Sequence, residues 1–160
     1  MNSRINYNVH SPELVKGLFE LSQLCSQRSS LGKTLADLVH IRASQLNGCA
    51  FCLDMHVKQA VIGGERPLRL HHVAIWRESP LFSARERAAL LWTETLTRIP
   101  EAGVSDAVYA EVREQFDDKA LSDLTWLVSS INAWNRLNVA FQSIPGSQDK
   151  AFGLDKAGLA

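Results

Sequence analysis

The stretch DLVHIRASQLNGCAFCLDMH, residues 37–56, decides the fold because it joins the end of one helix to the start of the next. Apolar residues recur at spacings of three and four through this region and just before it, and Asn47-Gly48 is a helix stop signal. A second helix is expected to begin near Cys49 and to end at Gly63-Gly64. If the two helices form an antiparallel hairpin around Gly48, residues near His40 face His56.

Similar signals predict helices along the rest of the chain. No segment alternates between apolar and polar residues as a half-buried strand would. The sequence therefore predicts an all-α bundle of about seven helices, forming a single domain over residues 1–160 with a loose tail over 146–160. The other expected helices run from Pro12 through Cys25, from Pro67 to about Arg77, from Ser83 to before Pro100, from Ser105 to near Phe116, and from about Ser122 to Gln142.

The composition is that of a globular protein and excludes several classes of partner. Hydrophobic residues make up 46% of the 160 residues, and the 17 basic residues equal the 17 acidic ones. A chain without basic excess is not expected to bind nucleic acid or an anionic membrane. Neither a signal peptide nor a membrane span is recognisable, so a cytoplasmic location is expected. The long apolar helix with Trp126 and Trp134 favours a closed homo-oligomer.

The chemistry is expected to reside in Cys49, Cys52 and His56. At about 100° per residue, these side chains fall within roughly 60° of one another on a helix. Two cysteines three residues apart are close enough to form a disulfide. A position at a helix start also favours the thiolate through the helix dipole and the free N–H groups. In a reducing compartment, such a pair is more often catalytic or metal-binding than structural.

A thiol-redox role assigns a task to each of these residues. Cys52 is the candidate attacking thiolate, because His56 follows it by one helical turn and can exchange a proton with it. Cys49, expected nearer to solvent, is the candidate resolving thiol. Asp37 and His40 lie on one face of the preceding helix, so either is a candidate to orient the His56 imidazole.

Other interpretations of the same residues remain open. The cysteines can be two small buried residues, or half of a zinc site with His56 and a fourth ligand such as His40, His71 or His72. A structural zinc site normally takes ligand pairs from two segments, and the chain has no second such pair. Cys25, in an apolar helical series, is expected in the core.

These residues resemble the alkylhydroperoxidase AhpD core of the carboxymuconolactone decarboxylase superfamily. The resemblance covers roughly residues 14–142 and is most specific in SQLNG followed by the CxxCxxxH motif, with support from residues 85–90 and 131–136. It implies an all-helical homotrimer or homohexamer that reduces hydroperoxides through Cys49 and Cys52, with His56 as the family histidine. It also implies a thiol or dithiol electron-donor protein and no bound cofactor or metal.

The chain departs from the family pattern at two positions. The upstream acid, usually a glutamate twelve residues before the first cysteine, falls on Asp37, which is one methylene shorter. The histidine between the two cysteines is replaced by Phe51. Two further functions stay as alternatives: a muconolactone-type decarboxylase, although that branch typically lacks the CxxC pair, and a non-catalytic oligomer that is stabilised by zinc or senses redox state.

Overall fold

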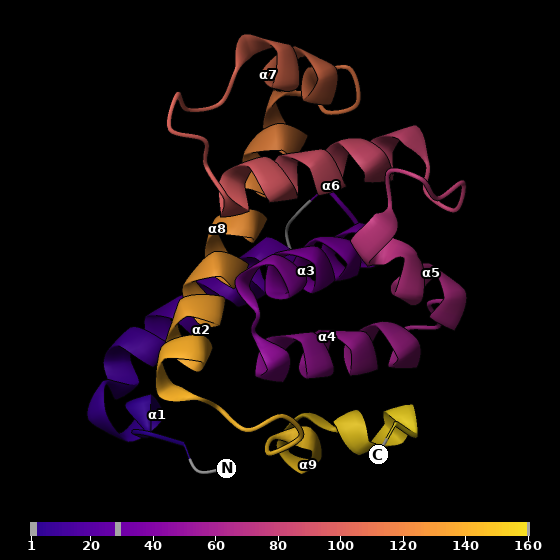
Figure 1. Ribbon diagram of the computed structural model, residues 1–160. Coiled ribbons are helices and arrows are strands. Elements are labelled where there is room, and N and C mark those ends of the chain that lie inside the picture. Colours follow the sequence, from indigo (N-terminus) through magenta and orange to yellow (C-terminus); the bar gives the residue numbers. More distant parts are fainter. Residues whose placement is uncertain (1–2, 28–29, 160) are drawn as a thin grey trace.

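The computed structural model describes residues 3–27 and 30–159, and all regular structure in these ranges is helical (Figure 1). The sequence-based prediction of an all-α fold is therefore confirmed. The chain contains more helices than the seven expected, because short helices occur at both ends. The elements are α1 (Tyr7–His10), α2 (Pro12–Gln27), α3 (Lys33–Asn47), α4 (Ala50–Ile62), α5 (Pro67–His72), η1 (Val73–Ile75), α6 (Ala84–Thr97), α7 (Asp106–Arg113), α8 (Asp118–Phe141), α9 (Asp149–Phe152) and η2 (Leu154–Ala157).

Helix α3 lies at the centre of the fold and packs against α4, α6 and α8. Buried residues occur around most of the circumference of α3, so two apolar clusters pack against different faces of this helix. One cluster joins α3 to α6, α7 and α8, with Val39, Phe116 and Leu124 almost fully buried. The other joins α3 to α4, α5 and α6 around Leu38 and Ile41. This packing fixes the α3–α4 hairpin, which the sequence predicted.

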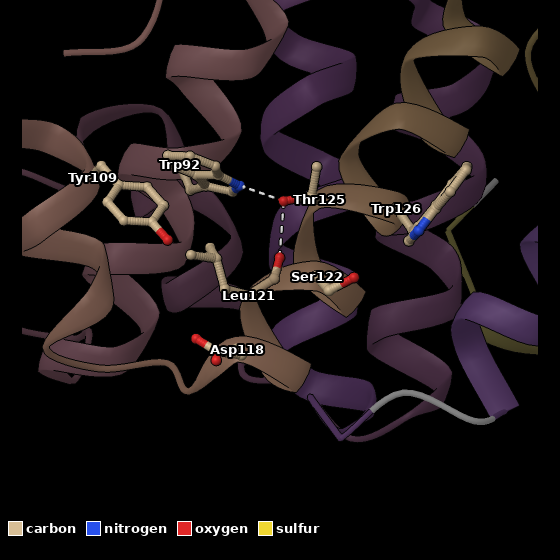
Figure 2. Close-up of a pocket in the computed structure, with 7 residues that line it drawn as sticks. All are labelled: Trp92, Tyr109, Asp118, Leu121, Ser122, Thr125 and Trp126. Atoms are coloured by element: carbon tan, nitrogen blue, oxygen red, sulfur yellow. Dashed lines mark hydrogen bonds between the residues drawn. The ribbon is translucent and has the colours of Figure 1, made fainter. Parts of the chain in front are cut away.

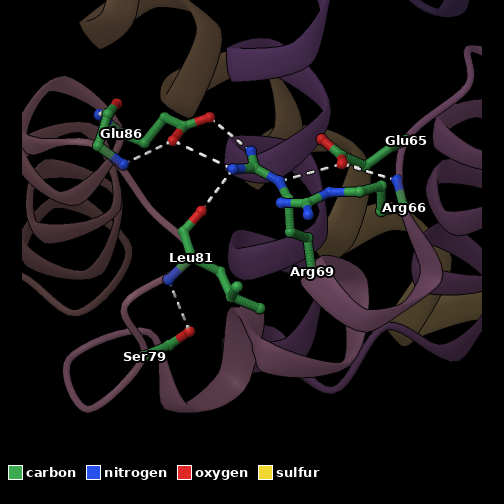
Figure 3. A network of polar contacts seen from close by, with 7 residues as sticks. Glu65, Arg66, Arg69, Ser79, Leu81 and Glu86 are labelled. Atoms are coloured by element: carbon green, nitrogen blue, oxygen red, sulfur yellow. Dashed lines mark hydrogen bonds and ion pairs between the residues drawn. The ribbon is translucent and has the colours of Figure 1, made fainter.

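An ion-pair network holds the segment that leads from α5 into the start of α6. The Arg69 guanidinium donates to the Glu65 carboxylate at 3.0 Å, to the Leu81 main-chain oxygen at 2.6 Å and to the Glu86 carboxylate at 2.5 Å (Figure 3). Glu86 and Ser83 also form a capping box at the start of α6, where the sequence predicted a helix to begin. The network links α5 to α6, and the predicted helix from Pro67 ends as α5 and η1, before Arg77.

The C-terminal segment is not the loose tail that the sequence suggested. The Lys58 ammonium group on α4 lies 2.7 Å from the Asp149 carboxylate and 2.9 Å from that of Asp54. The Gly146 N–H donates to the same Asp54 carboxylate, and Leu154 is buried. The segment therefore packs along α4 as α9 and η2, as Figure 1 shows below that helix. No helix within the described ranges is long and apolar enough to cross a membrane.

Candidate redox site

The turn between α3 and α4 places the first cysteine. Gly48 ends α3 in the left-handed conformation, with φ of 65°, which glycine adopts without steric cost. The next N–H, that of Cys49, donates to the Ser44 carbonyl at 3.0 Å. Cys49 then becomes the N-cap of α4, and its sulfur accepts the N–H of Cys52 at 3.2 Å. The turn thus places both sulfurs at the positive end of the α4 dipole.

The two cysteines are joined in a disulfide, with their Cα atoms 5.3 Å apart. The Cys49 residue is 2% exposed and Cys52 is 1% exposed. Cys49 was expected nearer to solvent, but both cysteines are almost fully buried, and α8 packs against both helices of the hairpin. The third cysteine, Cys25, is buried in the core as expected and has no disulfide partner.

A buried polar network connects the turn to α8. The Asn47 amide donates to the side-chain oxygens of Asn132 at 3.0 Å and Asn135 at 2.8 Å. Asn135 is fully buried, and its own amide donates to the Ser44 hydroxyl at 3.2 Å. Ser44 is the residue whose carbonyl holds the Cys49 N–H, so the network supports the position of the disulfide.

His56 lies one turn after Cys52 and is 6% exposed. Its Nδ1 atom is 2.9 Å from the Gln59 side-chain oxygen, whereas its Nε2 atom is buried without a hydrogen-bond partner among the described residues. Burial lowers the pKa of His56 to about 4, opposed by the hydrogen bond to the Gln59 side-chain oxygen and assisted by the charge of Lys33. The imidazole is therefore neutral at physiological pH.

His40 and Asp37 occupy different surroundings on α3. The His40 ring stacks on that of His56, with the ring centroids 4.4 Å apart. Burial, His56 and Lys33 hold the pKa of His40 well below its usual range. Asp37 is buried and its carboxylate pairs with the Lys33 ammonium group at 2.5 Å, and no hydrogen bond between described residues joins it to His56. The structure thus brings His40 to His56 and pairs Asp37 with Lys33.

The redox cluster consists of the two cysteines, His56 and the side chains around it, and two of its residues were not identified from the sequence. Gln59 bonds to His56, and Lys33 bonds both to Asp37 and to the Gln59 main-chain oxygen at 3.3 Å. The helical spacings of three from His56 to Gln59 and of four from Lys33 to Asp37 are signals that could have identified them.

The other candidate positions lie outside this cluster. The ring Nδ1 atom of His72 is 3.0 Å from the Ser79 hydroxyl, and His71 is exposed. No group of three or more histidine, cysteine or acidic side chains is placed to hold a metal ion within residues 3–27 and 30–159. Trp92 is buried, whereas Trp126 is 55% exposed and Trp134 donates its indole N–H to Ser22.

A surface pocket of about 350 Å³ lies between α6, α7 and α8, apart from the cysteines (Figure 2). Trp92, which donates its indole N–H to Thr125 at 3.0 Å, and Tyr109 lie on one side of it, and Trp126 lies on the other. None of its lining residues belongs to the redox cluster. The remaining lining residues are Asp118, Leu121 and Ser122.

Comparison with known proteins agrees with this geometry. The chain is 39% identical over 140 residues to the uncharacterized protein YdfG of Bacillus subtilis (strain 168), covering 88% of this chain and 95% of YdfG. The solved structure of ATU0492 from Agrobacterium tumefaciens, a protein of unknown function with a proposed AhpD antioxidant-defence role, superposes with a TM-score of 0.85. It is 38% identical, and the match covers 90% of this chain and 98% of that one.

A more distant structure shares the fold alone. The debrominase Bmp8 superposes with a TM-score of 0.78 at 18% identity, covering 92% of this chain and 78% of Bmp8.

The sequence profile of the Carboxymuconolactone decarboxylase family matches residues 12–95, which include the whole α3–α4 hairpin. This chain therefore belongs to the carboxymuconolactone decarboxylase family and has its AhpD-like core.

Proposed function

We propose that this protein is a thiol peroxidase that reduces hydroperoxides with Cys49 and Cys52 and is regenerated by a thiol or dithiol donor protein. The observation that carries the proposal is the buried Cys49–Cys52 disulfide at the start of α4 with the neutral His56 imidazole one turn away. The reduced, dithiol form of this pair releases two electrons when the disulfide forms, which is the number that reduction of one hydroperoxide requires. The decarboxylase alternative has no use for such a pair.

The proposed reaction starts from the reduced protein. Neutral His56 takes the proton of the Cys52 thiol, and the thiolate attacks the terminal oxygen of the hydroperoxide. The O–O bond breaks, Cys52 becomes a sulfenic acid, and the alkoxide leaves as an alcohol with the proton that His56 returns. The Cys49 thiol then attacks the sulfenic sulfur, which releases water and forms the disulfide. A dithiol donor reduces that disulfide and becomes oxidised itself.

Asp37 and His40 are proposed as the groups that orient or assist His56. The ring contact between His40 and His56 supports a role in holding the imidazole plane. The Lys33–Asp37 pair supports an indirect role for the carboxylate, because Lys33 also contacts the main chain of Gln59. A homotrimer or homohexamer is likewise proposed, and light scattering at micromolar concentration tests it.

The cysteine variants test the proposed chemistry. Reduced protein is mixed with cumene hydroperoxide, and thiols and peptides are followed by thiol titration and mass spectrometry. We expect one intramolecular disulfide per peroxide for the parent protein, no reaction for Cys52→Ser, and a trapped sulfenic acid without turnover for Cys49→Ser. Cys25→Ser is the matched control and should react like the parent. Parent protein that keeps both thiols under excess peroxide would contradict the proposal. In a separate experiment, a panel of thioredoxin-like and lipoyl-protein donors identifies which class of reductant regenerates the protein.

A further inference from the structure

The two nitrogens of His56 have different surroundings, and this difference bears on how the residue can act. The Nδ1 atom faces the Gln59 side-chain oxygen at 2.9 Å. The Nε2 atom is buried without a partner in the described part of the chain. Long helical side chains lean toward the helix N-terminus, so this imidazole leans over the turn that carries Cys52, four residues earlier. The His40 ring lies against the face of the His56 ring, with the ring centroids 4.4 Å apart.

We propose that Gln59 is the positioning residue of His56: its side-chain oxygen accepts the Nδ1 hydrogen and so keeps Nε2 as an unprotonated base toward the cysteine pair. A neutral imidazole carries one N–H and one lone pair, so the partner of one nitrogen decides the state of the other. The inference rests on the proposed function for its catalytic meaning, but the tautomer itself does not.

The opposite arrangement is unfavourable in this environment. If the Gln59 amide were reversed, its NH₂ group would donate to Nδ1 and the hydrogen of His56 would move to Nε2. That N–H would then be buried without an acceptor, which is a costly state for a polar group. A protonated Nε2 also could not accept a thiol proton. A lone pair at Nε2 is instead able to accept a proton.

Charged groups around His56 explain why a neutral amide fills this role. Lys33, Asp37 and His40 approach from α3, and Glu65 after α4 influences Asp37. Lys33 also donates to the main-chain oxygen of Gln59 at 3.3 Å, so the backbone at this residue is tethered to α3. An amide acceptor fixes the Nδ1 hydrogen without adding a negative charge. A carboxylate in its place would stabilise the imidazolium and raise the pKa of His56.

Nitrogen-15 NMR of histidine-labelled, dithiothreitol-reduced protein reads the tautomer directly, without any peroxide. We expect the parent and Gln59→Glu proteins to hold the Nδ1–H tautomer of His56, and Gln59→Leu to lose this preference. The titration midpoint of His56 should rise by about one to three pH units in Gln59→Glu. Gln115→Leu, a change of a partly buried glutamine beyond α7, is the matched control and should leave the His56 resonances unchanged.

Stopped-flow oxidation by cumene hydroperoxide gives the second readout. Gln59→Leu should slow thiol oxidation on the order of 100-fold. At high pH, Gln59→Glu should oxidise its thiols as fast as the parent. The acid limb of its pH–rate profile should move to higher pH by the same number of pH units as the His56 titration midpoint measured by NMR. A parent spectrum with the hydrogen on Nε2, or an unchanged tautomer in Gln59→Leu, overturns the inference. A parent that fails to react with peroxide while the tautomer still depends on Gln59 refutes the proposed function and leaves the positioning role intact.

Discussion

The substitution Asn135→Ala should destabilise the protein and loosen the turn between α3 and α4 that carries Cys49, called here the redox turn. Asn135 is fully buried and makes two side-chain hydrogen bonds, one from Asn47 and one to the equally buried Ser44. A net loss of about 1 kcal/mol for each bond, added to the unpaired Ser44 hydroxyl and the small cavity, gives about 2–4 kcal/mol in the free energy of unfolding. Because the Ser44 carbonyl holds the Cys49 N–H, the disulfide should also become easier to reach.

Urea unfolding and the rate of disulfide reduction by dithiothreitol measure the two effects separately. Asn138→Ala is the matched control on the same helix, because Asn138 is buried and bonded to Tyr7 but makes no contact with the redox turn in the hydrogen-bond network. It should lower stability without changing the reduction rate. A free energy of unfolding for Asn135→Ala within about 0.5 kcal/mol of the parent value would contradict this expectation, since removal of a buried amide with two hydrogen bonds cannot be so nearly neutral.

Three further predictions concern the histidines and the C-terminal segment. His56→Ala should slow thiol oxidation by an organic hydroperoxide by about 100- to 10,000-fold, with smaller losses in Asp37→Ala and His40→Ala; an unchanged rate in His56→Ala would mean that the proton relay does not exist. Because the folded-state pKa of His56 lies below that of the unfolded chain, unfolding takes up protons, and from pH 7 to pH 5 this residue should remove about 2 kcal/mol of stability. Urea titrations should show that slope in the parent and a smaller one in His56→Gln. Lys58→Met should increase hydrogen exchange over residues 149–157, because it removes the ion pair to Asp149, and unchanged protection there would contradict a tethered segment.

The local signals of the redox hairpin were sufficient to predict it. Asn47-Gly48 stops α3, α4 begins next to Cys49, and α6 begins next to Ser83, where the sequence predicted these boundaries. These features depend on residues within four positions of one another, where helix geometry leaves few alternatives.

Contacts between distant segments could not be predicted in the same way. Lys58 reads as a solvated surface lysine, and only the folded chain brings Asp149 to it across 91 residues. Helix α8 starts at Asp118, four residues earlier than expected, because the Asp117 side chain caps it there. The burial of Cys49 likewise depends on how the helices pack together, which signals within a single helix do not determine.

The docking of the C-terminal segment has a practical consequence for anyone who expresses this protein. A chain shortened at Gly146 would lose Asp149 and the buried Leu154, so Lys58 would keep only one carboxylate partner and the α4 surface that packs against η2 would face water. Such a truncation, attractive because the last residues look dispensable in the sequence, would favour aggregation through the helix that carries the disulfide. A purification tag at this end is therefore better separated from Ala157 by a flexible spacer than fused directly to η2.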